Sequence, residues 1–287
     1  MRSEQEMMDM ILAFARHDER IRAVTMEGSR LNKNAPPDRF QDYDVSFIVR
    51  DIESYKKNDD WLDVFGKRII MQKPEGMALF PPEFGSFYGY LMLYEDTNRI
   101  DLTLIPLEDI KKYFREADSL TKVILDKDNI CPPLREPSDI DYRVQKPSPE
   151  FIDDCCNEFW WLSTYVTKGL CRNEPLYAIY HLQLMQKQLF NMTAWKVGGE
   201  THYAVSVGKS NKYLEKYVSR DIWNRILQTY QLNTVEALWE ALKNCCSLFQ
   251  EISAEVSRSL GYPYPDYAER VLKYIQQFYP APASDHR

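Results

Sequence analysis

The chain has 287 residues and a mass of 33.9 kDa, enough for one large domain or two of ordinary size. Hydrophobic residues make up 44%, which excludes a disordered chain, and no apolar run approaches the roughly 18 residues of a membrane span. The net charge of −7 argues against a protein that binds mainly to nucleic-acid phosphates. The acidic N-terminus lacks the features of a signal peptide, so we expect a cytoplasmic protein with no membrane partner.

The first half of the chain is predicted to be mixed α/β. Apolar side chains recur at helical spacing over residues 4–16, and further helical stretches fall near 51–65 and 106–117. Segments rich in β-branched and aromatic residues predict strands between these helices, and residues 94–99 resemble a hairpin turn. The predicted strands are 23–27, 43–49, 67–71, 90–94, 99–105 and 121–125.

The second half of the chain is predicted to be helical. Residues 131–149 hold five of the 16 prolines, which is typical of an extended linker or surface strap. Beyond it we expect helices only, at 149–169, 175–198, 209–217, 219–230, 234–259 and 266–278, and a frayed tail at 280–287. The predicted organisation is therefore an α/β domain at 1–130, a linker at 131–149 and a helical domain at 150–287.

Charge is distributed unevenly between the two halves. Residues 1–150 hold 22 Lys and Arg against 29 Asp and Glu, a net charge of −7, whereas residues 151–287 hold 14 of each. An acidic half suits metal ions or a cationic substrate, since its field concentrates cations. A merely solvated acidic surface would give the same count.

A Gly-Ser pair and two nearby aspartates form the most informative pattern. The predicted strand at 23–27 runs into Gly28-Ser29, and after 12 residues the next strand brings Asp42 and Asp44. Strand side chains alternate, so both carboxylates face the same way and repel each other unless a cation lies between them. Mg²⁺ is the natural occupant, because it prefers carboxylates and phosphates. Gly28 lets a phosphate approach the backbone, and Ser29 offers a hydroxyl.

Asp101 is a third candidate ligand. It lies in the apolar segment RIDLTLI, where an unpaired acid would be costly. If this strand lies beside the strand of Asp42 and Asp44, three carboxylates converge, as in two-metal phosphoryl or nucleotidyl transfer.

These segments resemble a known family. EGSRLN followed by DYDVSFIV resembles the nucleotidyltransferase superfamily that includes DNA polymerase beta. RIDLTLIP and the helical segments NEFWWLSTYVTKGLCRNE and YHLQLMQKQLFNMTAWKVG are similar to aminoglycoside 6-adenylyltransferases, the streptomycin-modifying enzymes of Gram-positive bacteria. The resemblance covers nearly the whole chain. It implies an α+β fold, in which a nucleotidyltransferase-type mixed sheet flanked by helices precedes an all-α bundle that binds the substrate.

The resemblance also implies a reaction, namely adenylyl transfer from ATP to the 6-hydroxyl of streptomycin with release of pyrophosphate, conferring resistance. Gly28 and Ser29 would bind the triphosphate, and Asp42 and Asp44 would bind Mg²⁺, with two ions expected. Asp101 would ligate a metal, accept the proton of the attacking hydroxyl, or both. Electrostatic stabilisation by the metals is expected to be the largest contribution to the rate.

Five further residues are candidates for binding roles. Arg30 is a phosphate clamp or an ion-paired surface residue, and Lys168 is a candidate cation for the nucleotide phosphates. Asp153, Asp154 and Glu158 contact a cationic substrate or form the solvated first turns of a helix, where acids are favoured.

Three alternatives to this assignment differ in acceptor or in activity. A nucleic-acid nucleotidyltransferase is disfavoured by the absence of a basic patch. A different small-molecule acceptor, such as another aminocyclitol or a lincosamide, stays open. A non-catalytic interaction protein of the same fold is disfavoured because it has no use for three crowded acids. We expect a monomer with its active site in the cleft between the two domains.

Overall fold

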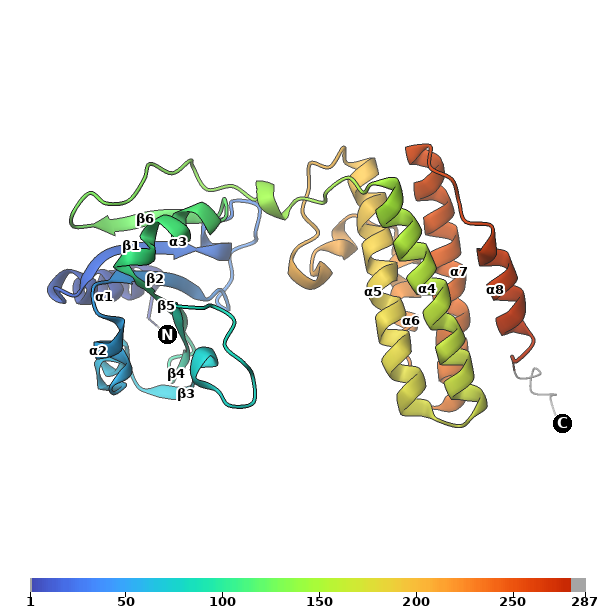
Figure 1. The fold of residues 1–287 in the computed structure, drawn as a ribbon, viewed down its shortest axis with the longest axis horizontal. Coiled ribbons are helices and arrows are strands. Elements are labelled where there is room, and N and C mark those ends of the chain that lie inside the picture. Colours follow the sequence, from blue (N-terminus) through green and yellow to red (C-terminus); the bar gives the residue numbers. More distant parts are fainter. Residues whose placement is uncertain (1, 280–287) are drawn as a thin grey trace. The chain divides into compact units, whose positions relative to one another are not determined.

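The computed structural model describes residues 2–279 and divides into two compact units (Figure 1). The first ends at Asp141 and the second begins at Tyr142. This boundary falls within the segment 131–149 that the proline content predicts as a linker. The tail at 280–287, which we expected to be frayed, lies outside the described residues.

The first unit is built on a mixed six-stranded sheet. In sheet order its strands are β3 (Arg68–Gln72), β4 (Tyr88–Tyr94), β5 (Arg99–Pro106), β2 (Tyr43–Val49), β1 (Ile21–Glu27) and β6 (Thr121–Asp126). Only β2 and β5 pair in parallel; the other described pairs are antiparallel. All six predicted strands are present, and β4 and β5 are joined by the predicted turn, where the Thr97 N–H donates to the Tyr94 carbonyl.

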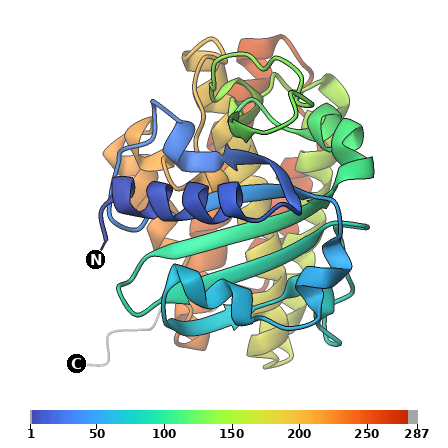
Figure 2. The same ribbon diagram turned by 90° about the vertical axis from the view of Figure 1, so that its left-hand side faces the viewer.

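The two faces of the sheet differ in character. α1 (Glu4–His17) lies across one face (Figure 2) and buries Met7, Ile11 and Ala15 against odd-numbered residues of β2 and even-numbered residues of β5. α2 (Ile52–Lys56) contributes Tyr55 to the same core. The opposite face has a small apolar cluster under α3 (Ile110–Glu116) and turns polar toward the N-terminal ends of β2 and β5.

The second unit is a helical bundle. Its helices are α4 (Pro149–Cys171), α5 (Pro175–Glu200), α6 (Arg220–Gln228), α7 (Val235–Leu260) and α8 (Tyr267–Gln276). α4, α5 and α7 pack together around an aromatic centre, where the Phe159 and Phe249 rings stack with centroids 3.6 Å apart. Ser148 caps α4 and Thr234 caps α7 by accepting backbone N–H bonds, as their side chains favour. The predicted α+β class is confirmed.

One predicted helix, at 209–217, is wrong. The segment contains only two short 3₁₀ turns, Lys209–Asn211 and Leu214–Lys216. Gly208, Ser210 and Asn211 all have positive φ, which a right-handed helix does not accept. Among the described residues, no helix combines the length and apolar character that a bilayer span demands.

Candidate active site

Strand pairing places two of the predicted acids side by side. β2 and β5 are neighbours, and Asp44 is the register partner of Asp101. Asp42 immediately precedes β2 and shares the side of Asp44, because strand side chains alternate. All three lie on the sheet face opposite α1. The two acid-bearing strands are therefore adjacent, which is the condition under which the three carboxylates converge.

Gly28 provides the space for one of these carboxylates. It follows β1 with φ +78°, and a β-carbon built on it would lie 2.3 Å from Asp44 Oδ2. Its N–H already donates to the Leu120 carbonyl, so the contribution of Gly28 here is the space that it leaves for the Asp44 carboxylate. Ser29 continues into a single 3₁₀ turn, Gly28–Leu31, and its carbonyl accepts a bond from Gln41 Nε2 at 3.2 Å. This turn brings the end of β1 against the start of β2.

The acids are bridged by an arginine that the sequence reasoning did not single out. Arg99 Nε and Nη2 donate to the two carboxylate oxygens of Asp101, both at 2.8 Å. Arg99 Nε also lies 3.6 Å from Asp42 Oδ2. Burial raises the pKa of Asp42; Arg99 opposes this shift, and the nearby Asp101 charge adds to it. The only clue in the sequence was the Arg-x-Asp spacing, which puts both side chains on one strand face.

The donor set fits a magnesium ion, since carboxylate oxygens on two adjacent strands are the ligands that this ion prefers. Among residues 2–279, however, no three His, Cys, Asp or Glu side chains are already arranged to hold a metal. The Arg99 guanidinium occupies both oxygens of Asp101 and lies against Asp42. A cation that uses these oxygens must therefore displace Arg99.

Arg30 is placed differently from the predicted phosphate clamp. Its side chain is 9% exposed, and its guanidinium stacks 3.7 Å from the Tyr43 ring centroid. It donates to the carbonyls of Asp42 and Gln41 at 2.9 and 2.8 Å. The guanidinium thus holds the segment that carries Asp42, which favours the structural one of its two interpretations.

Glu27 is a second group that the sequence reasoning missed. It is the register partner of Asp44 on β1, and its carboxylate accepts hydrogen bonds from the hydroxyls of Thr25, Tyr113 and Ser46. Burial raises its pKa to about 7, a shift that the three hydroxyls oppose and the Asp44 charge increases. This hydrogen-bond network links α3 to β1 and β2.

The predicted residues of the helical unit lie on α4. Asp153, Asp154 and Glu158 are exposed, and the last two are four residues apart on one face of the helix. Lys168 Nζ lies 4.6 Å from the Tyr165 ring centroid, a cation–π contact. The structure thus places the three acids on one helix, α4, and Lys168 beside an aromatic ring of the same helix.

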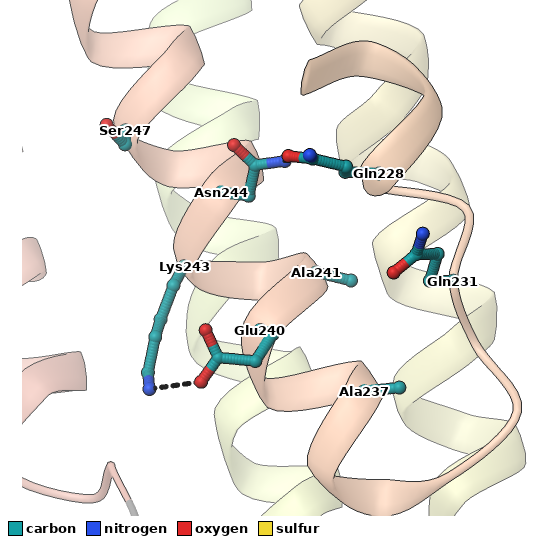
Figure 3. A pocket seen from close by; sticks show the side chains of 8 residues that line it. All are labelled: Gln228, Gln231, Ala237, Glu240, Ala241, Lys243, Asn244 and Ser247. Atoms are coloured by element: carbon teal, nitrogen blue, oxygen red, sulfur yellow. Dashed lines mark hydrogen bonds and ion pairs between the residues drawn. The ribbon is translucent and has the colours of Figure 1, made fainter. Parts of the chain in front are cut away.

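The helical unit also has a hollow beside α6 and α7 that carries none of the predicted residues (Figure 3). Its polar groups bond mainly to each other: Lys243 pairs with Glu240 at 2.6 Å, and Asn244 donates to Gln228 at 3.2 Å. The polar side chains of this hollow therefore face one another and do not converge on a common binding point. The lining residues are Gln228, Gln231, Ala237, Glu240, Ala241, Lys243, Asn244 and Ser247.

Comparison with known proteins identifies the family. Residues 1–278 match the family model described as streptomycin adenylyltransferase. The chain belongs to this family. The predicted resemblance is confirmed, and so is the prediction of a nucleotidyltransferase, an enzyme class that generally uses ATP and a divalent metal ion.

The similarity to known proteins covers nearly the whole chain. An aminoglycoside 6-adenylyltransferase of Bacillus subtilis (strain 168) is 50% identical over 97% of this chain and 99% of its own length. An aminoglycoside 6-adenylyltransferase of Campylobacter jejuni is 49% identical over 96% of this chain and 95% of its own. A solved aminoglycoside 6-adenyltransferase from Bacillus subtilis is 46% identical and covers 98% of this chain and 100% of its own, with a TM-score of 0.49.

Proposed function

We propose that this family member transfers the adenylyl group of ATP to the 6-hydroxyl of streptomycin, releases pyrophosphate and thereby confers resistance. The observation that carries the proposal is the pairing of Asp44 with Asp101 beside Gly28, which gathers acids where a glycine leaves room. The relatives at 50% and 49% identity are named for adenylylation at position 6, which supports this acceptor position.

The proposed chemistry is a displacement at the α-phosphorus. The acceptor hydroxyl oxygen bonds to that phosphorus, the bond to the bridging oxygen of the β-phosphate breaks, and pyrophosphate leaves. Asp101 accepts the hydroxyl proton, a role worth about 10²–10⁴-fold in rate. Mg²⁺ held by Asp42, Asp44 and Asp101, as two ions on this proposal, supplies charge neutralisation at the transferring phosphate and the leaving group.

Other residues have supporting roles in the proposal. Gly28 and Ser29 bind the triphosphate at the turn after β1, and Lys168 contacts the nucleotide phosphates. Asp153, Asp154 and Glu158 bind the cationic groups of the acceptor, because exposed carboxylates on one helix suit a polycation. The net charge of −7 of residues 1–150 favours a cationic acceptor in general.

Mass spectrometry of drugs incubated with the protein, ATP and Mg²⁺ tests the proposal. We expect streptomycin to gain one adenylyl group, and spectinomycin and kanamycin to stay unmodified. If pyrophosphate forms only with another amino-sugar drug, the acceptor assignment is wrong and the chemistry stands. If no acceptor yields either product, the proposed reaction is wrong.

Binding experiments examine the metal site separately. Asp44→Asn should lose Mg²⁺-dependent ATP binding, since it removes the charge of the central ligand. Asp63→Asn is a matched control, because Asp63 is an exposed acid of the same unit that pairs with Arg68 at 2.7 Å. Equal Mg²⁺-dependent binding by the parent and Asp44→Asn would contradict the metal-site assignment.

A further inference from the structure

Arg99 differs from two deeply buried arginines that pair with acids in the first unit, Arg22 and Arg30. The Arg22 side chain is 8% exposed and binds Asp128 and Glu19, and the Arg30 side chain is 9% exposed under its own contacts. Arg99 is 43% exposed although it bridges two acids. Its guanidinium can therefore turn into solvent without uncovering the core, whereas Arg22 and Arg30 cannot leave without opening packed structure.

The groups that Arg99 binds are the proposed metal ligands. Its planar fork matches the Asp101 carboxylate with two parallel bonds, the strongest geometry for such a pair. The third contact, to Asp42 at 3.6 Å, is a longer ion pair. A metal ion and this guanidinium need the same oxygens, so their binding is mutually exclusive.

We propose that Arg99 is a built-in counter-cation of the acid site, which neutralises Asp42 and Asp101 in the metal-free enzyme and is displaced when the divalent ion binds. This inference rests on the proposed metal site described above. Without such a cation, three acids on two adjacent strands would repel one another and weaken the pairing of β2 with β5.

The same contact lowers the affinity of the free enzyme for metal, since the ion must first break a bidentate pair. Because the pair is partly exposed, this cost is modest and the exchange is reversible. Lysine would not serve equally well, because its ammonium is a point charge that lacks the two-pronged match to a carboxylate. Arg99 is thus a positioning residue that acts through the acids.

Titration with Mn²⁺ alone, followed by the electron paramagnetic resonance signal of the free ion, tests the inference without nucleotide or turnover. We expect Arg99→Gln to bind Mn²⁺ roughly fivefold to tenfold more tightly than the parent, which is at the lower end of the range for coupled binding events. Arg50→Gln is the matched control: it removes the same charge from a 56% exposed side chain that pairs with Asp128 at 3.8 Å. Its affinity for Mn²⁺ should match that of the parent.

Thermal unfolding gives a second readout. Metal-free Arg99→Gln should unfold at a lower temperature than the parent, and saturating Mn²⁺ should raise its midpoint more than that of the parent. If Arg99→Gln does not fold, Arg99→Lys keeps the charge without the fork and should show a smaller tightening in the same direction. Unchanged or weaker Mn²⁺ binding by a folded Arg99 variant overturns the inference.

Asp44→Asn distinguishes a failure of the proposed metal site from a failure of the counter-cation role of Arg99. If the parent binds Mn²⁺, Asp44→Asn does not, and Arg99→Gln behaves as the parent, the metal site stands and the counter-cation role fails. If the parent, Asp44→Asn and Arg99→Gln all bind no Mn²⁺, the proposed metal site fails, and the inference fails with it.

Discussion

An oxygen of the Asp44 carboxylate lies only 2.3 Å from the position that a β-carbon on Gly28 would occupy. Residue 28 also has φ +78°, a conformation that glycine adopts readily and other residues adopt at a cost. The end of β1 and the acid on β2 are therefore fitted to each other, and any side chain at position 28 must move Asp44.

Gly28→Ala should consequently reduce activity by more than its effect on stability explains. We expect the loss of Mg²⁺-dependent ATP binding and at least a roughly 10²-fold lower kcat/KM, the scale of a small misplacement of catalytic groups. Gly261→Ala is the control, because Gly261 has φ +71° but no atom within 4 Å of an added β-carbon. It should lower the free energy of unfolding by about 1 kcal/mol and keep full activity. Equal activity of the two variants would contradict the fit of Gly28 to Asp44.

Asp101→Asn should separate binding from chemistry. The amide keeps the shape of the side chain but accepts no proton from the hydroxyl, so kcat should fall by roughly 10²–10⁴-fold while ATP binding persists. Rapid-quench measurement of adenylylated product checks the loss of kcat, and equilibrium binding of ATP checks that nucleotide binding persists. Asp128→Asn breaks a different arginine pair, with Arg22, and should lower stability without lowering kcat. Full activity in Asp101→Asn would remove this residue from the mechanism.

Arg30→Lys should destabilise the first unit despite conserving charge. Lysine cannot reproduce both the stack on Tyr43 and the bonds to the carbonyls of Gln41 and Asp42, so the free energy of unfolding should fall by about 1–3 kcal/mol. Urea denaturation measures this loss. Arg39→Lys, an exposed change beside Phe40, should leave stability within about 0.5 kcal/mol of the parent. A stability equal to the parent in Arg30→Lys would argue against its structural role.

Asp96 should make stability depend on acidic pH. Its bond from the Arg2 guanidinium, with further bonds from Asn98, holds the pKa of the carboxyl well below its ordinary value of 3.8. A lowered pKa stabilises the folded state above the unfolded-state value, and this contribution is lost as the pH falls through the folded-state value. Asp96→Asn should therefore cost about 1–2 kcal/mol at pH 7, and less as the pH falls below about 4.

Urea denaturation of the parent and Asp96→Asn between pH 7 and pH 3 measures this difference. Asp63→Asn removes a more exposed acid, 69% exposed and paired with Arg68, and should change stability little at any pH. A difference between Asp96→Asn and the parent that is the same at pH 7 and pH 3 would contradict the assignment of the shift to Asp96.

The sequence by itself determined those features that depend on neighbours along the chain. The alternation in DYDVSFIV put Asp42 and Asp44 on one strand face, and the helical spacing of apolar residues located most of the bundle. The glycine after β1 was recognisable because strand, turn and acid followed in a fixed order. These are local constraints of sterics and hydrogen bonding, so they can be read without knowing the partners.

Only the tertiary structure decided which groups meet. Nothing local dictates that β5 pairs in parallel with β2, yet this pairing sets Asp101 beside Asp44 and brings Arg99 within 3.6 Å of Asp42. Likewise, the Tyr113 hydroxyl bonds to Glu27 across 86 residues of chain, and the Arg30 guanidinium stacks on the Tyr43 ring. Strand order, burial and the choice among competing partners are properties of the whole chain, because each depends on the free energy of packing all elements together.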